Sequence, residues 1–271
     1  MFRAIKFVAG LTLLASTCAT QAFPTQQAVP GGLVILPLAS QEERMPTAYY
    51  AGARVTVVPQ DSNWVALVGI PLDTESGLQQ LEVNLGGVQQ AVNFEVQPKH
   101  YRTQHLRIKD KNKVEPDEDS SERIVQEMAL QKRLTQHYIG EVLSTEFIRP
   151  IQGRDSGRFG LRRILNGQQR QPHSGMDIAA TVGTPVKVVA PGRVIYTGNL
   201  FFSGNVVYVD HGGGLISMYA HLSQINVRNG EFLEQGDYLG AVGSTGRATG
   251  PHLHWSVYLN GTAIKIGRAH V

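Results

Sequence analysis

Three separate segments in the C-terminal half hold four of the nine histidines, and they constrain the fold of this chain more than any other feature. One segment carries His173 and Asp177, a second carries His221, and the third carries His252 and His254. If the chain folds so that these segments meet, two imidazoles and one carboxylate can bind a zinc ion that keeps one position open. The two histidines left over can move protons. These residue types therefore predict a metal-dependent hydrolase.

The spacing within the segments predicts strands and a turn rather than a helix. His252 and His254 are two residues apart, so on a strand their side chains point to the same face, roughly 7 Å apart. One imidazole can then bind the metal while the other lies beside the water. Gly175 predicts that His173 lies in a turn, which leads into a strand over residues 177–179. A sheet is therefore expected to carry the site.

The other histidines have no comparable partners in the sequence. His211 follows a strand pattern and precedes a glycine, so we interpret it as a turn residue. We interpret His100, His105 and His137 as surface residues and assign no role to His270 in the terminal tail.

Residues 1–22 have the pattern of a secretory signal peptide. Arg3 and Lys6 precede a short apolar run, and small residues follow up to a cleavage site after Ala22. A retained N-terminal anchor and lipidation at Cys18 are the alternatives. Because Cys18 is the only cysteine, cleavage would leave no thiol for a disulfide, a nucleophile or a metal ligand. We expect an exported protein, in the periplasm or secreted, with no stable membrane insertion after cleavage.

Residues 23–108 show the alternating apolar pattern of half-buried strands. The candidate strands recur about every ten residues between turn signals, which favours a small β-sandwich. They lie at 33–38, 54–58, 64–70, 81–85 and 91–96. No cluster of ligand residues occurs among them, so we expect a packing or interaction module.

Residues 109–146 predict a linker followed by one amphipathic helix. The stretch 109–119 is charged and poor in apolar residues, and Asp119 and Glu122 then have the spacing of a capping box. Apolar residues follow at helical spacing until Gly140. We expect this apolar stripe, which includes Met128, to pack against a domain rather than a membrane.

Residues 147–271 return to short strands with glycine-rich turns. The candidates lie at 186–190, 192–196, 205–210, 215–220, 238–242 and 254–259. The predicted fold class is therefore mainly β: an N-terminal small β-sandwich, a connecting helix and a C-terminal antiparallel sheet domain with the metal site on one sheet face.

The two halves carry opposite charge. Residues 23–146 hold 11 Lys and Arg against 16 Asp and Glu, whereas residues 147–271 hold 12 against 6. This asymmetry predicts that the halves attract each other or that the C-terminal half binds an anionic partner. The basic residues are scattered and no aromatic-rich basic cluster occurs, so nucleic acid is not an expected partner.

The C-terminal segments closely resemble the lysostaphin/LytM-type zinc endopeptidases, which cleave peptidoglycan peptides. The resemblance lies in the pattern His173-x-x-x-Asp177, followed downstream by His252-x-His254, with His221 between them. It extends over about 147–263 and includes the stretches 158–163, 166–168, 183–186 and 243–251. The strand pattern of the N-terminal half is similar to the sandwich domain that precedes this catalytic domain in some exported relatives.

The resemblance implies one zinc ion per catalytic domain, held by His173, Asp177 and His254, with His221 and His252 assisting catalysis. It leaves open which of these two histidines is the base and which stabilises the oxyanion. The implied activity is a murein D,D-endopeptidase that hydrolyses stem peptides or crosslinks. The chain departs from the family pattern after its last Asn-Gly turn, at 264–267, which puts the last strand in doubt.

Two alternatives remain at this stage. Some relatives have lost their metal ligands and act as binding modules that activate a cell-wall amidase, so a non-catalytic module is the second hypothesis. The N-terminal half and its helix can either cover the catalytic groove, as an intramolecular inhibitor, or dock the substrate or a partner protein.

Overall fold

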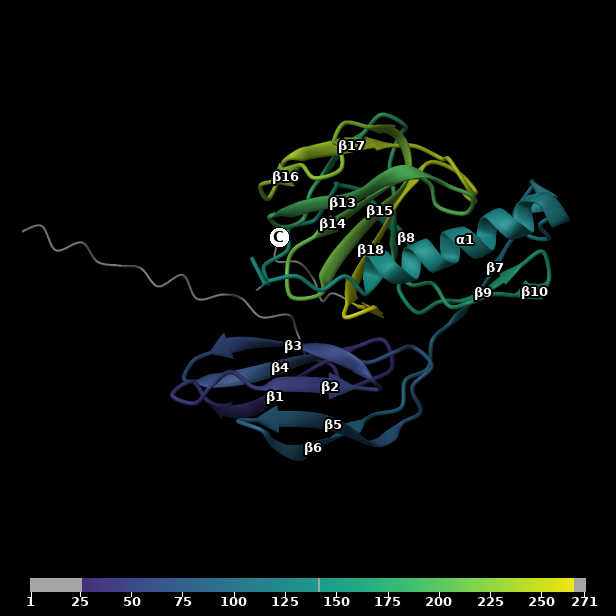
Figure 1. The fold of residues 1–271 in the computed structure, drawn as a ribbon. Helices are drawn as coiled ribbons and strands as arrows, with labels where there is room; N and C mark the ends of the chain where they lie inside the picture. The colour runs from purple at the N-terminus through teal and green to yellow at the C-terminus, as the bar shows by residue number, and fades with distance from the viewer. Residues whose placement is uncertain (1–25, 141, 266–271) are drawn as a thin grey trace, which may run out of the picture.

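The computed structural model describes residues 26–140 and 142–265, which form two β-sheet domains and, within those ranges, one α-helix (Figure 1). The predicted fold class is confirmed: a small β-sandwich comes first, a connecting helix follows, and an antiparallel sheet domain ends the chain. The predicted signal peptide, residues 1–22, lies outside the described residues. Among the described residues, no helix combines the length and the apolar character needed to cross a membrane.

The N-terminal domain is a six-stranded path in the order β1-β4-β3-β2-β5-β6. Its strands are β1 (Leu33–Ser40), β2 (Thr47–Tyr50), β3 (Ala53–Gln60), β4 (Asn63–Gly69), β5 (Gly77–Leu85) and β6 (Val88–Val96). Val34 of β1 and Val68 of β4 share one apolar core with Val83 of β5 and Val96 of β6. The two ends of the path therefore face each other, as in a sandwich.

The connecting segment contains β7 (Thr103–Leu106), the short 3-10 helix η1 (Lys111–Lys113) and the helix α1 (Glu118–Thr135). The cap differs from the prediction, because Asp117, rather than Asp119, accepts the backbone N–H of Ser120 at 2.8 Å. The apolar stripe is buried only in part: Leu134 packs on the C-terminal sheet, whereas Met128 is 61% exposed. The expectation that the stripe packs against a domain is confirmed at Leu134 and wrong at Met128.

The C-terminal domain is built on a sheet in the order β16-β13-β14-β15-β18-β11-β8. Its strands are β8 (Arg154–Gly157), β9 (Arg162–Leu165), β10 (Gln168–Gln169), β11 (Met176–Ala179), β12 (Pro185–Lys187), β13 (Gly192–Leu200), β14 (Gly204–Asp210), β15 (Leu215–Ile225), β16 (Phe232–Leu233), β17 (Tyr238–Val242), β18 (His252–Leu259) and β19 (Thr262–Ile264). The strand that the sequence left in doubt is β19, which pairs with β18.

The two domains share an apolar core. Leu33 of β1 and Leu67 of β4 belong to the same buried cluster as Val257 of β18 and Ile264 of β19. A backbone hydrogen bond of 2.8 Å from Lys265 N–H to the carbonyl of Gly31 closes this contact. The sandwich therefore lies directly against the end of β18, the strand that carries two of the predicted site histidines (Figure 1).

Candidate metal centre

Strand register brings the three polar segments together. β11 pairs with β18 so that Asp177 lies directly opposite His254 and Ala179 lies opposite His252. β18 pairs on its other side with β15, which places Ala220 beside His254 and leaves His221 one residue further. Neighbouring residues on paired strands are only about 5 Å apart, so residues distant in sequence become direct neighbours here.

His173 lies just before β11 and is fixed through its backbone. Its N–H donates to the carbonyl of Leu161 at 2.9 Å, and its own carbonyl accepts the N–H of Gly160 at 2.8 Å. Its ring Nδ1 lies 2.9 Å from the carbonyl oxygen of Arg158. A carbonyl can only accept, so Nδ1 carries the proton and Nε2 keeps a free lone pair.

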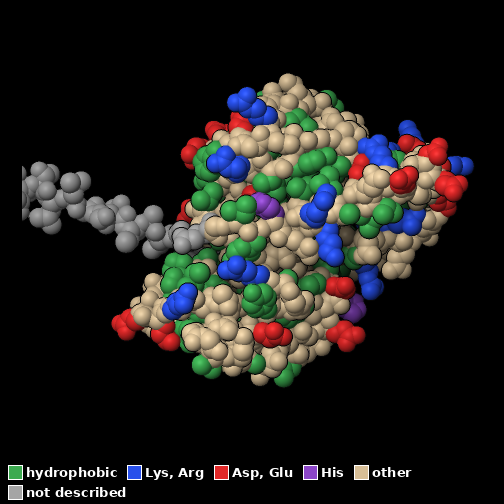
Figure 2. All heavy atoms as spheres, in the orientation of Figure 1, with side chains coloured by type: hydrophobic (Ala, Val, Ile, Leu, Met, Phe, Trp, Pro, Cys, Tyr) green, Lys and Arg blue, Asp and Glu red, His purple; other side chains and the backbone are tan. Residues whose placement is uncertain are grey.

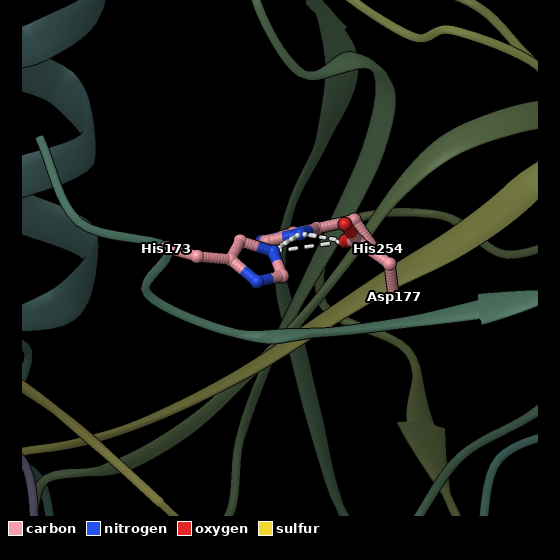
Figure 3. Close-up of side chains that lie close together, drawn as sticks. All are labelled: His173, Asp177 and His254. Atoms are coloured by element: carbon pink, nitrogen blue, oxygen red, sulfur yellow. Dashed lines mark hydrogen bonds and ion pairs between the residues drawn. The ribbon is translucent and has the colours of Figure 1, made fainter. Parts of the chain in front are cut away.

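Three donor atoms converge at one point, as Figure 3 shows. Asp177 Oδ1 lies 2.9 Å from His173 Nε2 and 2.8 Å from His254 Nδ1, and the two ring nitrogens are 2.9 Å apart. All three side chains are buried. On the far side of its ring, His254 Nε2 lies 2.9 Å from Ser256 Oγ, which fixes the ring orientation. This triangle of two nitrogens and one oxygen can hold a divalent metal ion.

The charge states of these groups suit metal binding. Burial would raise the pKa of Asp177, but its close contacts with His173 and His254 hold that pKa well below its usual value. Burial lowers the pKa of His254 to about 4, although Asp177 opposes this shift. At neutral pH the carboxyl group is therefore ionised and His254 is neutral, which are the forms that bind metal ions.

The second oxygen of Asp177 is held by an arginine that was not among the predicted site residues. Arg163 Nη2, on β9, donates to Asp177 Oδ2 at 2.5 Å. Gly157 on β8 pairs with Asp177, and a Cβ atom at position 157 would lie only 2.3 Å from the same oxygen. Arg163 and Gly157 both occur in the segment around β8 and β9, but nothing in their sequence spacing connects them to Asp177.

The two remaining histidines lie beside the triangle. Nδ1 of His221 donates to the carbonyl of Thr245 and Nδ1 of His252 donates to that of Gly250, both at 2.8 Å. Their ring centroids are 4.7 Å apart, and His252 Nε2 lies 3.8 Å from Asp177 Oδ1. Both rings therefore keep a free Nε2, and that of His252 faces the metal triangle.

His221 has an unusual backbone and environment. Its φ angle is 63°, a left-handed conformation that costs a residue other than glycine about 1–3 kcal/mol. A backbone hydrogen bond of 2.8 Å to the carbonyl of Ser203 holds it there. Burial, followed by the charges of His252 and His254, lowers the pKa of His221 to about 3. The ring is therefore neutral at pH 7.

The other described histidines lie outside the metal triangle and differ in burial and in hydrogen-bond partners. His211 lies directly after β14, at a turn as predicted, but it is fully buried and hydrogen-bonded to Pro191 O and Ser217 Oγ. Burial lowers its pKa to about 4. His137 is not simply a surface residue, because its Nδ1 lies 3.0 Å from Asp210 Oδ2. His100 and His105 are exposed, as predicted.

Comparison with known proteins identifies the class. The model of peptidase family M23 matches residues 171–266, and the model of the peptidase family M23 N-terminal domain matches residues 26–99. A solved structure from Pseudomonas aeruginosa, assigned to peptidase M23, is 38% identical, with a TM-score of 0.74 over 88% of this chain and 93% of that chain. The chain belongs to peptidase family M23.

Curated relatives match part of this chain. The peptidoglycan DD-endopeptidase ShyA of Vibrio cholerae is 37% identical over 136 residues, which are 49% of this chain and 32% of ShyA. The DD-carboxypeptidase/endopeptidase Mpg of Neisseria meningitidis is 42% identical over 114 residues, 42% of this chain and 26% of Mpg. The chain thus spans between about a quarter and a third of the length of these relatives.

Proposed function

We propose that this chain is an exported zinc metalloendopeptidase that hydrolyses peptide bonds in peptidoglycan stem peptides or crosslinks. The observation that supports this most directly is the buried convergence of His173, Asp177 and His254, with two further histidines beside it. The M23 family membership and the names of the relatives ShyA and Mpg support a peptidoglycan substrate, with a murein D,D-endopeptidase as the specific form.

His173, Asp177 and His254 would hold the zinc ion. Zinc in proteins prefers imidazole and carboxylate donors at about 2.0–2.2 Å, which in a tetrahedral site puts the donor atoms about 3.3 Å apart. The donors here are 2.8–2.9 Å apart, so each needs to move outward by only a small amount. When bound, zinc supplies a Lewis acid that activates water and polarises a substrate carbonyl.

His221 and His252 would serve the proton transfers. Each ring has its Nδ1 proton committed to a backbone carbonyl, so each offers Nε2 as the atom that accepts a proton. One of them takes a proton from the attacking water, and the protonated ring later donates it to the leaving amine. The other, once protonated on Nε2, would stabilise the developing oxyanion as a cation.

Each segment of the chain would have its own role in this activity. Residues 1–22 would direct export to the periplasm or the medium and be removed, and residues 147–271 would form the catalytic unit. Residues 23–108 and the linker and helix of 109–146 would support or regulate it. A nucleic-acid partner is not proposed, since on the face seen in Figure 2 the Lys and Arg side chains are dispersed and do not form one continuous patch.

The second candidate is a non-catalytic module that activates a cell-wall amidase. Such a role would not require metal ligands or proton-transfer groups. In this chain all five polar side chains are retained, and backbone carbonyls fix the ring tautomers of His173, His221 and His252. That arrangement favours the enzyme.

Digestion of purified sacculi tests the proposed function. The zinc-loaded mature protein is expected to release peptides cut at a stem or crosslink bond, and mass spectrometry of the products identifies that bond. EDTA is expected to stop the release and added zinc to restore it. Intact sacculi after treatment with zinc-loaded protein, together with stimulation of a purified amidase, would favour the activating module instead.

We further propose that the linker inhibits the enzyme from within the chain. It contacts both sides of the region around the metal centre. Val114, together with Ile108 just before the linker, packs on Leu165 of β9, while Lys113 Nζ donates to the carbonyl of Phe201 at 2.9 Å. Phe201 precedes Ser203, whose carbonyl holds the backbone of His221. A segment that spans these two sides would limit the access of a peptide to the site.

Val114→Asp tests this inhibition. Val114 is only 5% exposed, so a carboxylate there would lose its apolar contacts and detach the linker, and we expect several-fold faster cleavage of sacculi. Val125→Asp is the matched control, because Val125 lies on α1 with 66% of its surface exposed and should leave the rate unchanged. An unchanged rate in Val114→Asp, with the protein folded, would argue that the linker docks a substrate or partner rather than covering the site.

A further inference from the structure

Three arginines gather beside the metal centre. Arg163 and Arg170 are cross-strand neighbours on the β9–β10 hairpin, where Arg170 N–H donates to the carbonyl of Arg163 at 2.9 Å. Like charges directly opposite each other on paired strands destabilise a hairpin. Arg163 also reaches Asp177, so this pair of arginines directly adjoins the metal ligands.

The third arginine comes from the opposite side. Arg247 follows Gly246 in the loop between β17 and β18, and its guanidinium lies 4.3 Å from the ring centroid of Phe202. Burial, followed by the charges of Arg163 and Arg170, lowers the pKa of Arg247 to about 10. The group remains a cation at neutral pH. Arg170 and Arg247 bind the adjacent carbonyls of Val114 and Lys113, and Arg170 is hydrogen-bonded to Arg163, so the three are named the arginine cluster below.

The positive charge of the arginine cluster exceeds the negative charge bound to it. In the part of the chain that the structure describes, Asp177 is the carboxylate that hydrogen-bonds to the cluster, through Arg163, and its other oxygen belongs to the metal triangle. The Nε atoms of Arg163 and Arg170 are buried and have no hydrogen-bond partner among the described residues. Buried donors without partners are costly, which indicates that the cluster is built for a further acceptor.

The linker supplies only neutral acceptors at this place. Arg170 Nη2 donates to the carbonyl of Val114 at 2.6 Å, and Arg247 Nη1 lies 3.5 Å from the carbonyl of Lys113. Two adjacent backbone carbonyls are thus held by arginines from opposite sides. Guanidinium groups form especially strong hydrogen bonds with an ionised carboxylate, because both partners are charged and two parallel N–H···O bonds can form, whereas a backbone carbonyl offers one neutral oxygen.

We propose that the arginine cluster is a carboxylate-binding subsite that recognises a free carboxylate of the peptide substrate near the scissile bond. Arg170 and Arg247 contact this carboxylate, and Arg163 links the subsite to Asp177. The carbonyls of Lys113 and Val114 occupy the subsite until the substrate displaces them. This inference rests on the proposed peptidase function, since it assigns the specificity of the same groove.

The test compares two synthetic stem peptides that differ only in having free or amidated side-chain and α-carboxyl groups. Binding of each labelled peptide to the metal-free full mature chain is measured by fluorescence anisotropy. A charge-assisted hydrogen bond contributes about 1.5–3 kcal/mol, so we expect the free-acid peptide to bind about 10- to 100-fold more tightly. The Val114→Asp variant is measured in parallel, so that competition by the linker is assessed.

Arg247→Gln is expected to remove most of this preference, and Arg247→Lys to retain part of it, because lysine keeps the charge but not the planar pair of donors. Arg170→Gln is a second, independent variant in case the first fails to fold. Arg228→Gln is the matched control, since Arg228 is exposed in the loop before β16. Thermal unfolding checks that each variant is folded.

Equal binding of the two peptides by the wild type, or an unchanged preference in folded Arg247→Gln and Arg170→Gln, would overturn the subsite. No measurable binding of the free-acid peptide at millimolar concentration would also overturn it. The proposed function fails separately: if zinc-loaded protein cuts neither peptide while the charge preference depends on Arg247, the subsite stands without the peptidase. If both peptides are cut equally and the variants change nothing, the peptidase stands without the subsite.

Discussion

His254→Ala is expected to abolish both metal binding and cleavage, whereas His252→Ala is expected to keep the metal and lose most turnover. The two side chains are only two residues apart on β18, but their roles in the geometry differ. His254 Nδ1 is within 2.9 Å of both other donor atoms, so its removal leaves two ligands. His252 Nε2 is 3.8 Å from Asp177 Oδ1, so it is not one of the three donor atoms that converge. Loss of a proton-transfer group lowers turnover by about 10²–10⁴-fold.

Two measurements distinguish these outcomes. Metal content after dialysis against a weak chelator reports binding, and the rate of peptide release from sacculi reports turnover. His100→Ala is the control, because His100 is exposed outside the site and should change neither quantity. Equal loss of zinc from His252→Ala and His254→Ala would contradict the division of roles.

Gly157→Ala is expected to weaken metal binding strongly while the protein stays folded. A methyl group at position 157 would lie 2.3 Å from Asp177 Oδ2 and 2.9 Å from its Cγ, so the carboxyl group must move. That movement breaks the hydrogen bond from Arg163 and shifts the donor oxygen away from His173 and His254. Disturbing such supporting contacts commonly costs about 10- to 100-fold in metal affinity.

Titration with a competing chelator measures this loss, and the unfolding temperature of the metal-free protein measures the fold. Gly157 has no left-handed backbone angle, so alanine meets no conformational strain there. Ser156→Ala is the neighbouring control: Ser156 donates only to the backbone carbonyl of Asp177, at 3.2 Å, and its loss should have a much smaller effect. Unchanged affinity in Gly157→Ala would mean that the position of Oδ2 does not matter for the metal.

The sequence predicted the fold where the burial pattern repeats often enough to be recognised. β5 alternates between exposed residues and the buried Leu81 and Val83, and its direction and face follow from that alternation. β2 and β7 have four residues each, too few for a period to emerge. The helix start was misplaced because Asp117 and Asp119 are both good caps, and only the three-dimensional context selects between them.

The ligand residues of the candidate site could be predicted from their chemistry and spacing, but the residues that support them could not. Histidines and an aspartate at strand and turn spacing indicate a ligand set, and the register of β11 on β18 brings Asp177 and His254 together. The contributions of Arg163 and Gly157 depend on how β8 and β9 pack beside β11, which no local pattern encodes. The charged segment after residue 109 has no periodicity, so its attachment to β9 and the loop at Phe201 could not be predicted either.

The apolar interface between the two domains limits how the protein can change conformation and how it can be divided into separate domains. Leu33 and Leu67 are buried against Val257 and Ile264. Separating the sandwich from the C-terminal domain would therefore expose apolar surface on both domains to water. An activator is therefore expected to displace the linker around Val114 and to leave the interface between the two domains intact. If the catalytic domain is produced alone, polar substitutions at that interface will be needed to keep it soluble.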